Sequence, residues 1–239
     1  MTLYGRDLAH AHDTGFGFIA RAGAAALIDR LRADGADRGL VVDLGCGSGI
    51  AARILIDAGY EVHGVDQSAD LIAIARERAP EATFEVASIH DADLPAGAVA
   101  VVAMGEILNF AGIGDALFAR VRATLRPGGL FAFDIATPGR ESTTPRRAWH
   151  EGDGWVVCLE AQGDSEAMRL TRRIATFRRD GDIWARSDET HELELYDPGD
   201  LVVQLTRAGL TEACVVEEGY GPAVDIPGLV VLAARAPAA

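Results

Sequence analysis

The 239-residue chain is long enough for one large domain, and its 49% hydrophobic and 24% charged residues are typical of a globular protein rather than a disordered one. Its 36 acidic residues outnumber 22 basic residues, all arginine, so the net charge of −14 disfavours nucleic acid or an anionic membrane as a partner. Because lysine is absent, a Schiff-base lysine and a phosphate-binding P-loop lysine are excluded.

The cysteines and the N-terminus indicate a cellular compartment. Cys46, Cys158 and Cys214 are odd in number and form no CxxC pair, which disfavours a disulfide framework or a structural zinc site. His10 and His12 lack a third matched metal ligand, so we predict a solvated entry segment and no bound metal. Without a signal-peptide pattern or a long apolar run, we expect a cytoplasmic protein with no membrane partner.

Short apolar runs alternate with helical patterns along the first half of the chain. This rhythm, which resumes near the C-terminus, predicts a doubly wound α/β fold with a mostly parallel, seven-stranded, Rossmann-like sheet. The last two strands are expected to pair antiparallel. The predicted strands are 39–44, 61–65, 83–87, 99–104, 130–134, 211–217 and 228–234, and the predicted helices include 16–31, 48–59, 68–80, 116–125 and 197–209.

Period-two alternation interrupts this rhythm after Asp134. Segments 155–161, 168–177 and 183–196 are separated by turn signals, which predicts a three-stranded antiparallel meander. We therefore expect one domain over 1–239, with an N-terminal helical cap over 1–38 and an antiparallel β insertion or lid over 140–196.

A glycine-rich turn between a predicted buried strand and a helix is the most informative motif. Gly45, Gly47 and Gly49 allow close approach of a ligand to the backbone, because no Cβ intervenes. Asp66 ends the next strand, where a carboxylate accepts hydrogen bonds from ribose hydroxyls. Asp43 precedes the turn, where its charge opposes a pyrophosphate and suits a cationic amino-acid ligand.

Three motifs in order carry a family resemblance. D-L-G-C-G-S-G at 43–49, G-V-D-Q-S at 64–68 and L-R-P-G-G at 125–129 closely resemble class I S-adenosylmethionine-dependent methyltransferases of the small-molecule type. The resemblance covers about residues 15–135. It implies S-adenosylmethionine as cofactor, S-adenosylhomocysteine as product and a small molecule as acceptor.

The resemblance also implies roles for individual residues. The turn would cradle the methionine portion and Asp43 would orient its ammonium, while Asp66 would hold the ribose. The usual acid after the third strand is replaced by Ser88-Ile89, which leaves the Ser88 hydroxyl, the Ile89 amide and apolar packing as alternatives for adenine. The implied cofactor-binding residues are Asp43, Gly45, Cys46, Gly47, Gly49, Asp66, Gln67, Ser88, Ile89, Met104 and Gly105. Tyr4 and Arg21 are added as candidate partners for the methionine carboxylate, because a planar guanidinium suits a carboxylate, although Arg21 would serve equally as a solvated helix residue.

Few side chains are candidates for the acceptor site. The segment after the fourth strand offers Glu106 as a catalytic candidate and Asn109 as a substrate contact, although Glu106 would serve equally as a helix cap. His191 and Glu189 project from one face of a predicted strand, so His191 is an oriented base or one member of a hydrogen-bonded pair. His150 is a further candidate base. The arginines at 169–179 have two interpretations. A charged face in contact with solvent is favoured over a site that recognises an acidic substrate.

These patterns predict methyl transfer to an oxygen or nitrogen nucleophile of a small molecule by in-line displacement. A nicotinamide-dependent oxidoreductase shares the glycine turn and Asp66, but we expect it to have a longer glycine fingerprint and no Asp43. A noncatalytic cofactor-binding module would lack an acceptor pocket. Either a monomer or a homodimer is compatible with the insertion.

Overall fold

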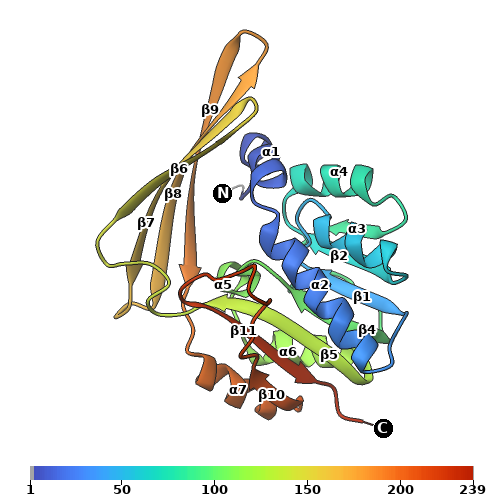
Figure 1. The fold of residues 1–239 in the computed structure, drawn as a ribbon. Coiled ribbons are helices and arrows are strands. Elements are labelled where there is room, and N and C mark those ends of the chain that lie inside the picture. Colours follow the sequence, from blue (N-terminus) through green and yellow to red (C-terminus); the bar gives the residue numbers. More distant parts are fainter. Residues whose placement is uncertain (1–2, 239) are drawn as a thin grey trace.

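The computed structural model describes residues 3–238. Its larger sheet has seven strands in the order β10-β11-β5-β4-β1-β2-β3, with β11 antiparallel to both of its neighbours (Figure 1). This architecture confirms the predicted fold class. The strands are β1 (Leu40–Leu44), β2 (Glu61–Asp66), β3 (Thr83–Val86), β4 (Ala98–Ala103), β5 (Leu125–Ala136), β10 (Thr211–Val215) and β11 (Leu229–Arg235).

Helices cover both faces of this sheet because its central strands are almost entirely apolar. All six residues of β4 are buried. One face packs against α2 (Phe18–Ala33) and α3 (Ile50–Asp57), and the other packs against α5 (Ile107–Ala111), α6 (Asp115–Thr124) and α7 (Pro198–Arg207). The helix α4 (Ala69–Arg78) contacts β3 and is capped by Ser68, as its sequence predicts. The strands β1, β2 and β4 are parallel neighbours, so the turns that follow them meet at one edge of the sheet.

A second sheet has four antiparallel strands in the order β6-β7-β8-β9 and stands away from the α/β layers (Figure 1). The strands are β6 (Arg146–Gly152), β7 (Trp155–Asp164), β8 (Arg169–Asp180) and β9 (Ile183–Glu194). The prediction of three strands was wrong because β6 is exposed along nearly its whole length. An exposed edge strand gains its order from pairing with β7, so its sequence carries no apolar alternation.

The N-terminus forms two helices rather than one. The helix α1 (Arg6–Gly15) precedes α2 and packs against α4 and the four-stranded sheet. Ion pairs fix it at both sides, from Asp7 to Arg178 on β8 and from Asp13 to Arg78 on α4. The helix α1 therefore bridges the two sheets above the strand ends.

Residues 126–129, which lie between the predicted helix 116–125 and the predicted strand 130–134, form the irregular start of β5, where Gly128 adopts φ 71°. Within residues 3–238, no helix combines the length and apolarity needed to cross a bilayer.

Candidate functional site

The glycine turn joins β1 to α3 at the carboxyl edge of the large sheet. Gly45, Gly47 and Gly49 all have positive φ, which side-chain-bearing residues rarely adopt. A Cβ at Gly45 would lie 2.6 Å from the Ile107 side chain, so that glycine is also required by packing. A Cβ at Gly47 would meet no atom within 4 Å, so this part of the turn borders open space. Cys46 is buried beneath the turn.

Asp66 at the end of β2 anchors the same turn. Its Oδ2 accepts a hydrogen bond from the Gly47 amide at 2.9 Å, and its Oδ1 accepts one from the Ser68 amide at 2.8 Å. The Ser68 hydroxyl in turn donates to the Tyr4 carbonyl at 2.7 Å. Burial raises the pKa of Asp66 despite these bonds. The second strand end is thereby connected both to the glycine turn and to the N-terminal segment.

Asp43 at the end of β1 lacks such compensation. The residue is 2% exposed, and its Oδ2 atom has no hydrogen-bond partner among the described residues. Burial, and then the nearby charge of Asp66, raise the pKa of Asp43 to about 7. A buried carboxylate without a partner is costly, so this position favours a ligand that brings a positive charge.

The turn after β4 is the third wall of the site. Gly105 and Glu106 both have positive φ, 98° and 60°, and their amides donate to the Asp134 carboxylate at 2.7 and 2.5 Å. A Cβ at Gly105 would meet no atom within 4 Å. The Tyr220 hydroxyl donates to Oδ2 of Asp134 at 2.7 Å. Burial raises the pKa of Asp134 to about 6.

Glu106 is buried between two arginines. Its Oε1 lies 2.7 Å from Nε of Arg140, and its Oε2 lies 2.6 Å from Nη1 of Arg172 on β8. Burial raises the pKa of Glu106, but the charges of Arg172 and Arg140 outweigh burial and hold that pKa below its usual value. A carboxylate held in its charged form between two cations is a poor proton acceptor, so these contacts favour an anchoring role over that of a base.

The inner face of the four-stranded sheet brings His191 to the site. His191 is 1% exposed, and its Nε2 lies 2.9 Å from Oε2 of Glu189. The same carboxylate accepts the amide hydrogens of Tyr4 and Gly5 at 2.8 and 2.9 Å. The His191 ring contacts the rings of Tyr4 and Phe110, with centroids 5.0 and 5.5 Å away. Burial raises the pKa of Tyr4 to about 12, so its phenol stays protonated at neutral pH.

The two N-terminal histidines differ in their surroundings. The expectation of a solvated His12 was wrong, because its Nδ1 atom is buried with no hydrogen-bond partner within residues 3–238, and its ring centroid lies 4.9 Å from that of Tyr4. Burial lowers the pKa of His12 to about 4. His10 is exposed and lines a cleft of about 550 Å³ with His150 and Trp155. Across residues 3–238, no three His, Cys, Asp or Glu side chains are grouped to hold a metal ion.

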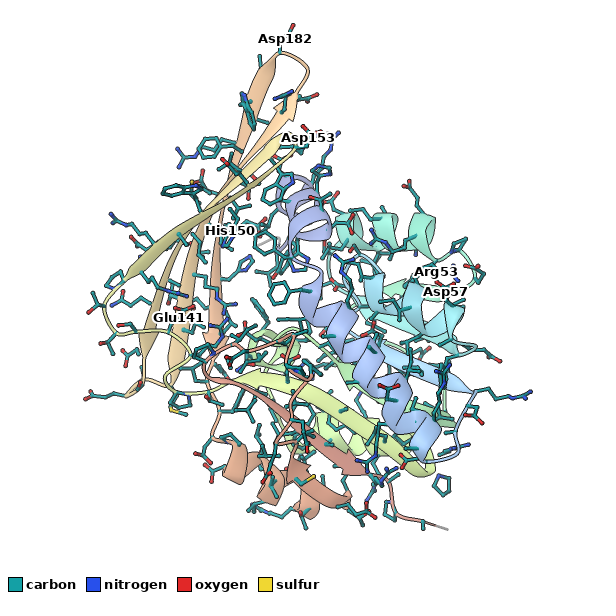
Figure 2. The ribbon with its side chains drawn as sticks, viewed as in Figure 1. Arg53, Asp57, Glu141, His150, Asp153 and Asp182 are labelled. Carbon is teal, nitrogen blue, oxygen red and sulfur yellow. The ribbon has the colours of Figure 1, made fainter. Side chains whose placement is uncertain are left out.

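His150 lies on exposed β6 beside α1, as Figure 2 shows. Its ring packs against that of Phe16, with the ring centroids 5.2 Å apart. No described contact joins it to Glu106, Tyr4 or His191, so its environment differs from that of His191. Of the two candidate histidines, His191 is the one buried at the strand ends.

Asn109 has a structural position that does not suit a substrate contact. Its Nδ2 donates to the carbonyls of Ala136 and Glu194, and its Oδ1 accepts the Ala136 amide, at 2.9, 2.5 and 2.9 Å. The residue is 1% exposed. These bonds join α5 to β5 and β9, so the Asn109 side chain has a structural role.

The other predicted cofactor contacts lie in different environments. The Ser88 hydroxyl accepts the His90 amide and keeps its own O–H for a further acceptor, and the Ile89 side chain is in the core. The Ser88 hydroxyl and the Ile89 amide therefore stay predicted contacts for adenine. Met104 packs beside Gly23 and Tyr220. Gln67 and Arg21 are exposed, and Arg21 folds back over Gly17 near the start of α3.

Sequence reasoning missed Asp134, Tyr220, Arg140 and the role of Arg172. The one local signal was the lone acid in the apolar strand F-A-F-D-I-A, because an unpaired carboxylate in a buried strand requires hydrogen-bond donors from elsewhere. Arg172 belongs to the arginine cluster that we expected to face solvent. It points inward because it pairs across the sheet with buried His191, and cross-strand partners share a face.

A family model described as "Methyltransferase domain" matches residues 41–129. The chain is 33% identical over 156 residues to trans-aconitate 2-methyltransferase of Paracidovorax citrulli, an alignment that covers 60% of this chain and 59% of that protein. The chain thus spans less than two thirds of that relative's length.

Two further similarities cover more of the chain. It is 32% identical over 180 residues to dTDP-3-amino-3,6-dideoxy-alpha-D-glucopyranose N,N-dimethyltransferase of Streptomyces fradiae, covering 72% of this chain and 69% of that one. The crystal structure of an S-adenosylmethionine-dependent methyltransferase from Clostridium acetobutylicum superposes with a TM-score of 0.80 at 19% identity, covering 96% of this chain and 97% of that one. The superposition on the Clostridium structure shows a shared fold over nearly the whole chain.

Proposed function

Because the chain belongs to the family of S-adenosylmethionine-dependent methyltransferases, we propose that it transfers a methyl group from S-adenosylmethionine to an oxygen or nitrogen atom of a small molecule. The observation that carries this proposal is the unpartnered, buried carboxylate of Asp43 beside the open glycine turn. S-adenosylmethionine brings an ammonium and a sulfonium to a site that lacks positive charge there. Its fit therefore rests on charge as well as on shape.

The residues that would hold this cofactor lie on neighbouring strand ends. Oδ2 of Asp43 would accept the ammonium, and the open backbone at Gly47 and Gly105 would admit the ligand closely. Asp66 would accept the ribose hydroxyls. Its two oxygens already accept two amides, but a carboxylate has about four lone-pair sites, so further donors can be accommodated.

When bound, S-adenosylmethionine supplies an electrophilic methyl carbon: the acceptor lone pair forms the new bond to this carbon while the sulfur–carbon bond breaks and its electron pair stays on sulfur. The protein aligns the reactants and removes the acceptor proton. The rigid Gly105–Glu106 turn and the inner face of the four-stranded sheet are the elements that would set this alignment.

We assign the proton-accepting role to His191. An ionised carboxylate accepts hydrogen bonds and donates none, so the contact with Glu189 places the proton of a neutral imidazole on Nε2. Nδ1 then keeps its lone pair for the acceptor. Glu189 is itself oriented by the amides of Tyr4 and Gly5, so this base has a fixed tautomer and direction.

The acceptor would lie between β8, β9 and the strand ends, where Arg172 is the cation that contacts Glu106. Arg172 binds Glu106 through Nη1, and its fork of five N–H groups retains donors for a second anion. This supports an acceptor that carries a carboxylate, as does the Paracidovorax relative named for trans-aconitate. An amino sugar nucleotide, suggested by the Streptomyces relative, is the alternative acceptor to test.

Calorimetric titration with S-adenosylmethionine, S-adenosylhomocysteine and NADH tests the cofactor first. We expect micromolar binding of both sulfur nucleosides and none of NADH, with Asp57→Asn as a matched control. Asp57 is an exposed carboxylate on α3 (Figure 2). Binding of NADH alone would refute the methyltransferase proposal. Transfer of a tritiated methyl group to trans-aconitate or to a dTDP-amino sugar then tests the acceptor.

A further inference from the structure

Asp134 and Tyr220 form a buried unit that connects three separate parts of the chain. Asp134 is 0% exposed near the end of β5, and Tyr220 comes from the segment between β10 and β11. The Asp134 carboxylate accepts three hydrogen bonds: Oδ1 from the Glu106 amide, and Oδ2 from the Gly105 amide and the Tyr220 hydroxyl. None of these donors lies close to Asp134 in sequence, so this contact depends on the tertiary fold.

The turn that this carboxylate holds is strained. Among residues 3–238, Glu106 is one of the few non-glycine residues with positive φ, a conformation that L-residues rarely adopt. Gly105 beside it also has positive φ and borders open space. Two amides that converge on one carboxylate keep the backbone in this conformation, because their loss would leave the buried Asp134 carboxylate with only the Tyr220 hydroxyl as a donor.

The consequences extend to the side chains on the turn. The direction of the Glu106 side chain follows from its backbone, and that side chain binds Arg140 and Arg172. Tyr220 also packs beside Met104: a Cβ at Gly23 would lie 2.5 Å from Sδ of Met104 and 3.3 Å from the Tyr220 ring. Asp134 and Tyr220 thus contact the segment from Met104 to Glu106 on its buried side and hold it in place.

We propose that Asp134 is a positioning residue for methyl transfer, which it serves by holding the Gly105–Glu106 turn, and that Tyr220 orients its carboxylate. This inference rests on the proposed function, because the turn matters for catalysis only if the reacting groups lie against it. Both side chains are buried behind the turn, so they would act through it. The effect is therefore expected on the rate of transfer more than on cofactor affinity, which the β1 and β2 strand ends provide.

The central test uses Asp134→Asn. An amide in place of the carboxylate directs an NH2 group at one of the two backbone N–H groups, so the turn should open. We expect kcat for methyl transfer to trans-aconitate to fall about tenfold to a hundredfold. The dissociation constant of S-adenosylhomocysteine should change less than about threefold. Asp57→Asn is the matched control.

Amide chemical shifts provide a readout that needs no acceptor. In the ligand-free protein the Gly105 and Glu106 amides should be strongly downfield and should move upfield in Asp134→Asn, while the Gly47 amide, bound to Asp66, stays in place. Tyr220→Phe keeps the carboxylate, removes one donor from Oδ2 and is expected to shift the Gly105 amide while lowering kcat about fivefold or less.

The outcomes separate this inference from the proposed function. Unmoved Gly105 and Glu106 amides in both variants, or a folded Asp134→Asn protein with wild-type kcat and reduced thermal stability alone, would overturn the positioning role. Should Asp134→Asn fail to fold, Tyr220→Phe decides on the same two readouts. Failure of the wild-type protein to bind S-adenosylhomocysteine or to methylate either acceptor would instead overturn the proposed function, and the catalytic purpose of the turn with it.

Discussion

Oε2 of Glu106 lies 2.6 Å from Nη1 of Arg172, and this ion pair joins the turn after β4 to a strand of the separate four-stranded sheet. Both side chains are largely buried, and Arg140 completes the cluster on the other oxygen. This ion pair holds the inner face of the four-stranded sheet against the turn after β4. A contact of this kind has measurable consequences for both stability and pH dependence.

Glu106→Gln should destabilise the protein by about 2–4 kcal/mol, because it leaves the buried Arg172 without its anion and leaves Arg140 with Glu141 alone. Urea unfolding at pH 7 measures this change. Removing the exposed ion pair with Arg186→Ala should leave the unfolding midpoint unchanged, since both members of the Arg186–Asp188 pair are in solvent. Equal midpoints for Glu106→Gln and the wild-type protein would contradict the anchoring role.

Asp43→Asn should stabilise the ligand-free protein at pH 8 and weaken its binding of S-adenosylmethionine. Burial raises the pKa of Asp43 to about 7 in the folded state, so between about pH 4 and pH 7 the folded chain binds more protons than the unfolded chain. Stability from this group therefore falls as pH rises through that window. Thermal unfolding at a series of pH values should show a shallower decline for Asp43→Asn than for the wild-type protein.

The remaining decline in that variant has a second source. Asp134, with a pKa raised to about 6, contributes in the same direction. A wild-type pH profile in Asp43→Asn would show that Asp43 ionises normally in the folded state.

Asp66→Ala should weaken S-adenosylhomocysteine binding by about 1–3 kcal/mol, or roughly five- to 150-fold, because charged hydrogen bonds to the ribose are lost. Calorimetry provides the dissociation constant. Because Asp66 also accepts the Gly47 and Ser68 amides, circular dichroism must show that the variant remains folded. Unchanged affinity would remove the ribose assignment.

His191→Gln should lower the rate of methyl transfer by about a hundredfold or more, since it removes the proposed general base. His150→Gln is the paired control and should retain the wild-type rate, because His150 is exposed on β6 and lies in the separate cleft beside α1. Initial rates with tritiated S-adenosylmethionine and trans-aconitate measure both. A greater loss in His150→Gln than in His191→Gln would reverse the assignment.

Local sequence determined the parts of the site that lie within one strand–turn–helix unit. Positive φ at Gly45, Gly47 and Gly49 follows from residue type, and Asp66 occupies the adjacent strand end because parallel strands repeat at a regular spacing. The seven-stranded fold was predictable for the same reason: each buried strand and amphipathic helix carries its own apolar period.

Roles that depend on a partner distant in the chain could not be predicted. Asn109, expected to contact substrate, donates to Glu194, a residue 85 positions away, and His12, expected in solvent, is covered by Tyr4 and its neighbours. The strand β6 was missed because its order comes from pairing with β7 rather than from its own pattern.

The sequence by itself therefore determined the α/β architecture, the family and the cofactor loop, because these depend on residue type and short-range periodicity. Only the tertiary structure decided that Arg172 and Arg178 of the 169–179 cluster face inward, that Glu106 is an anion held by Arg140 and Arg172, and that Asp134 and Tyr220 hold the turn behind it. The physical reason is that burial and charge compensation are set by groups far apart in sequence, which meet only when the two sheets and the C-terminal segment pack together.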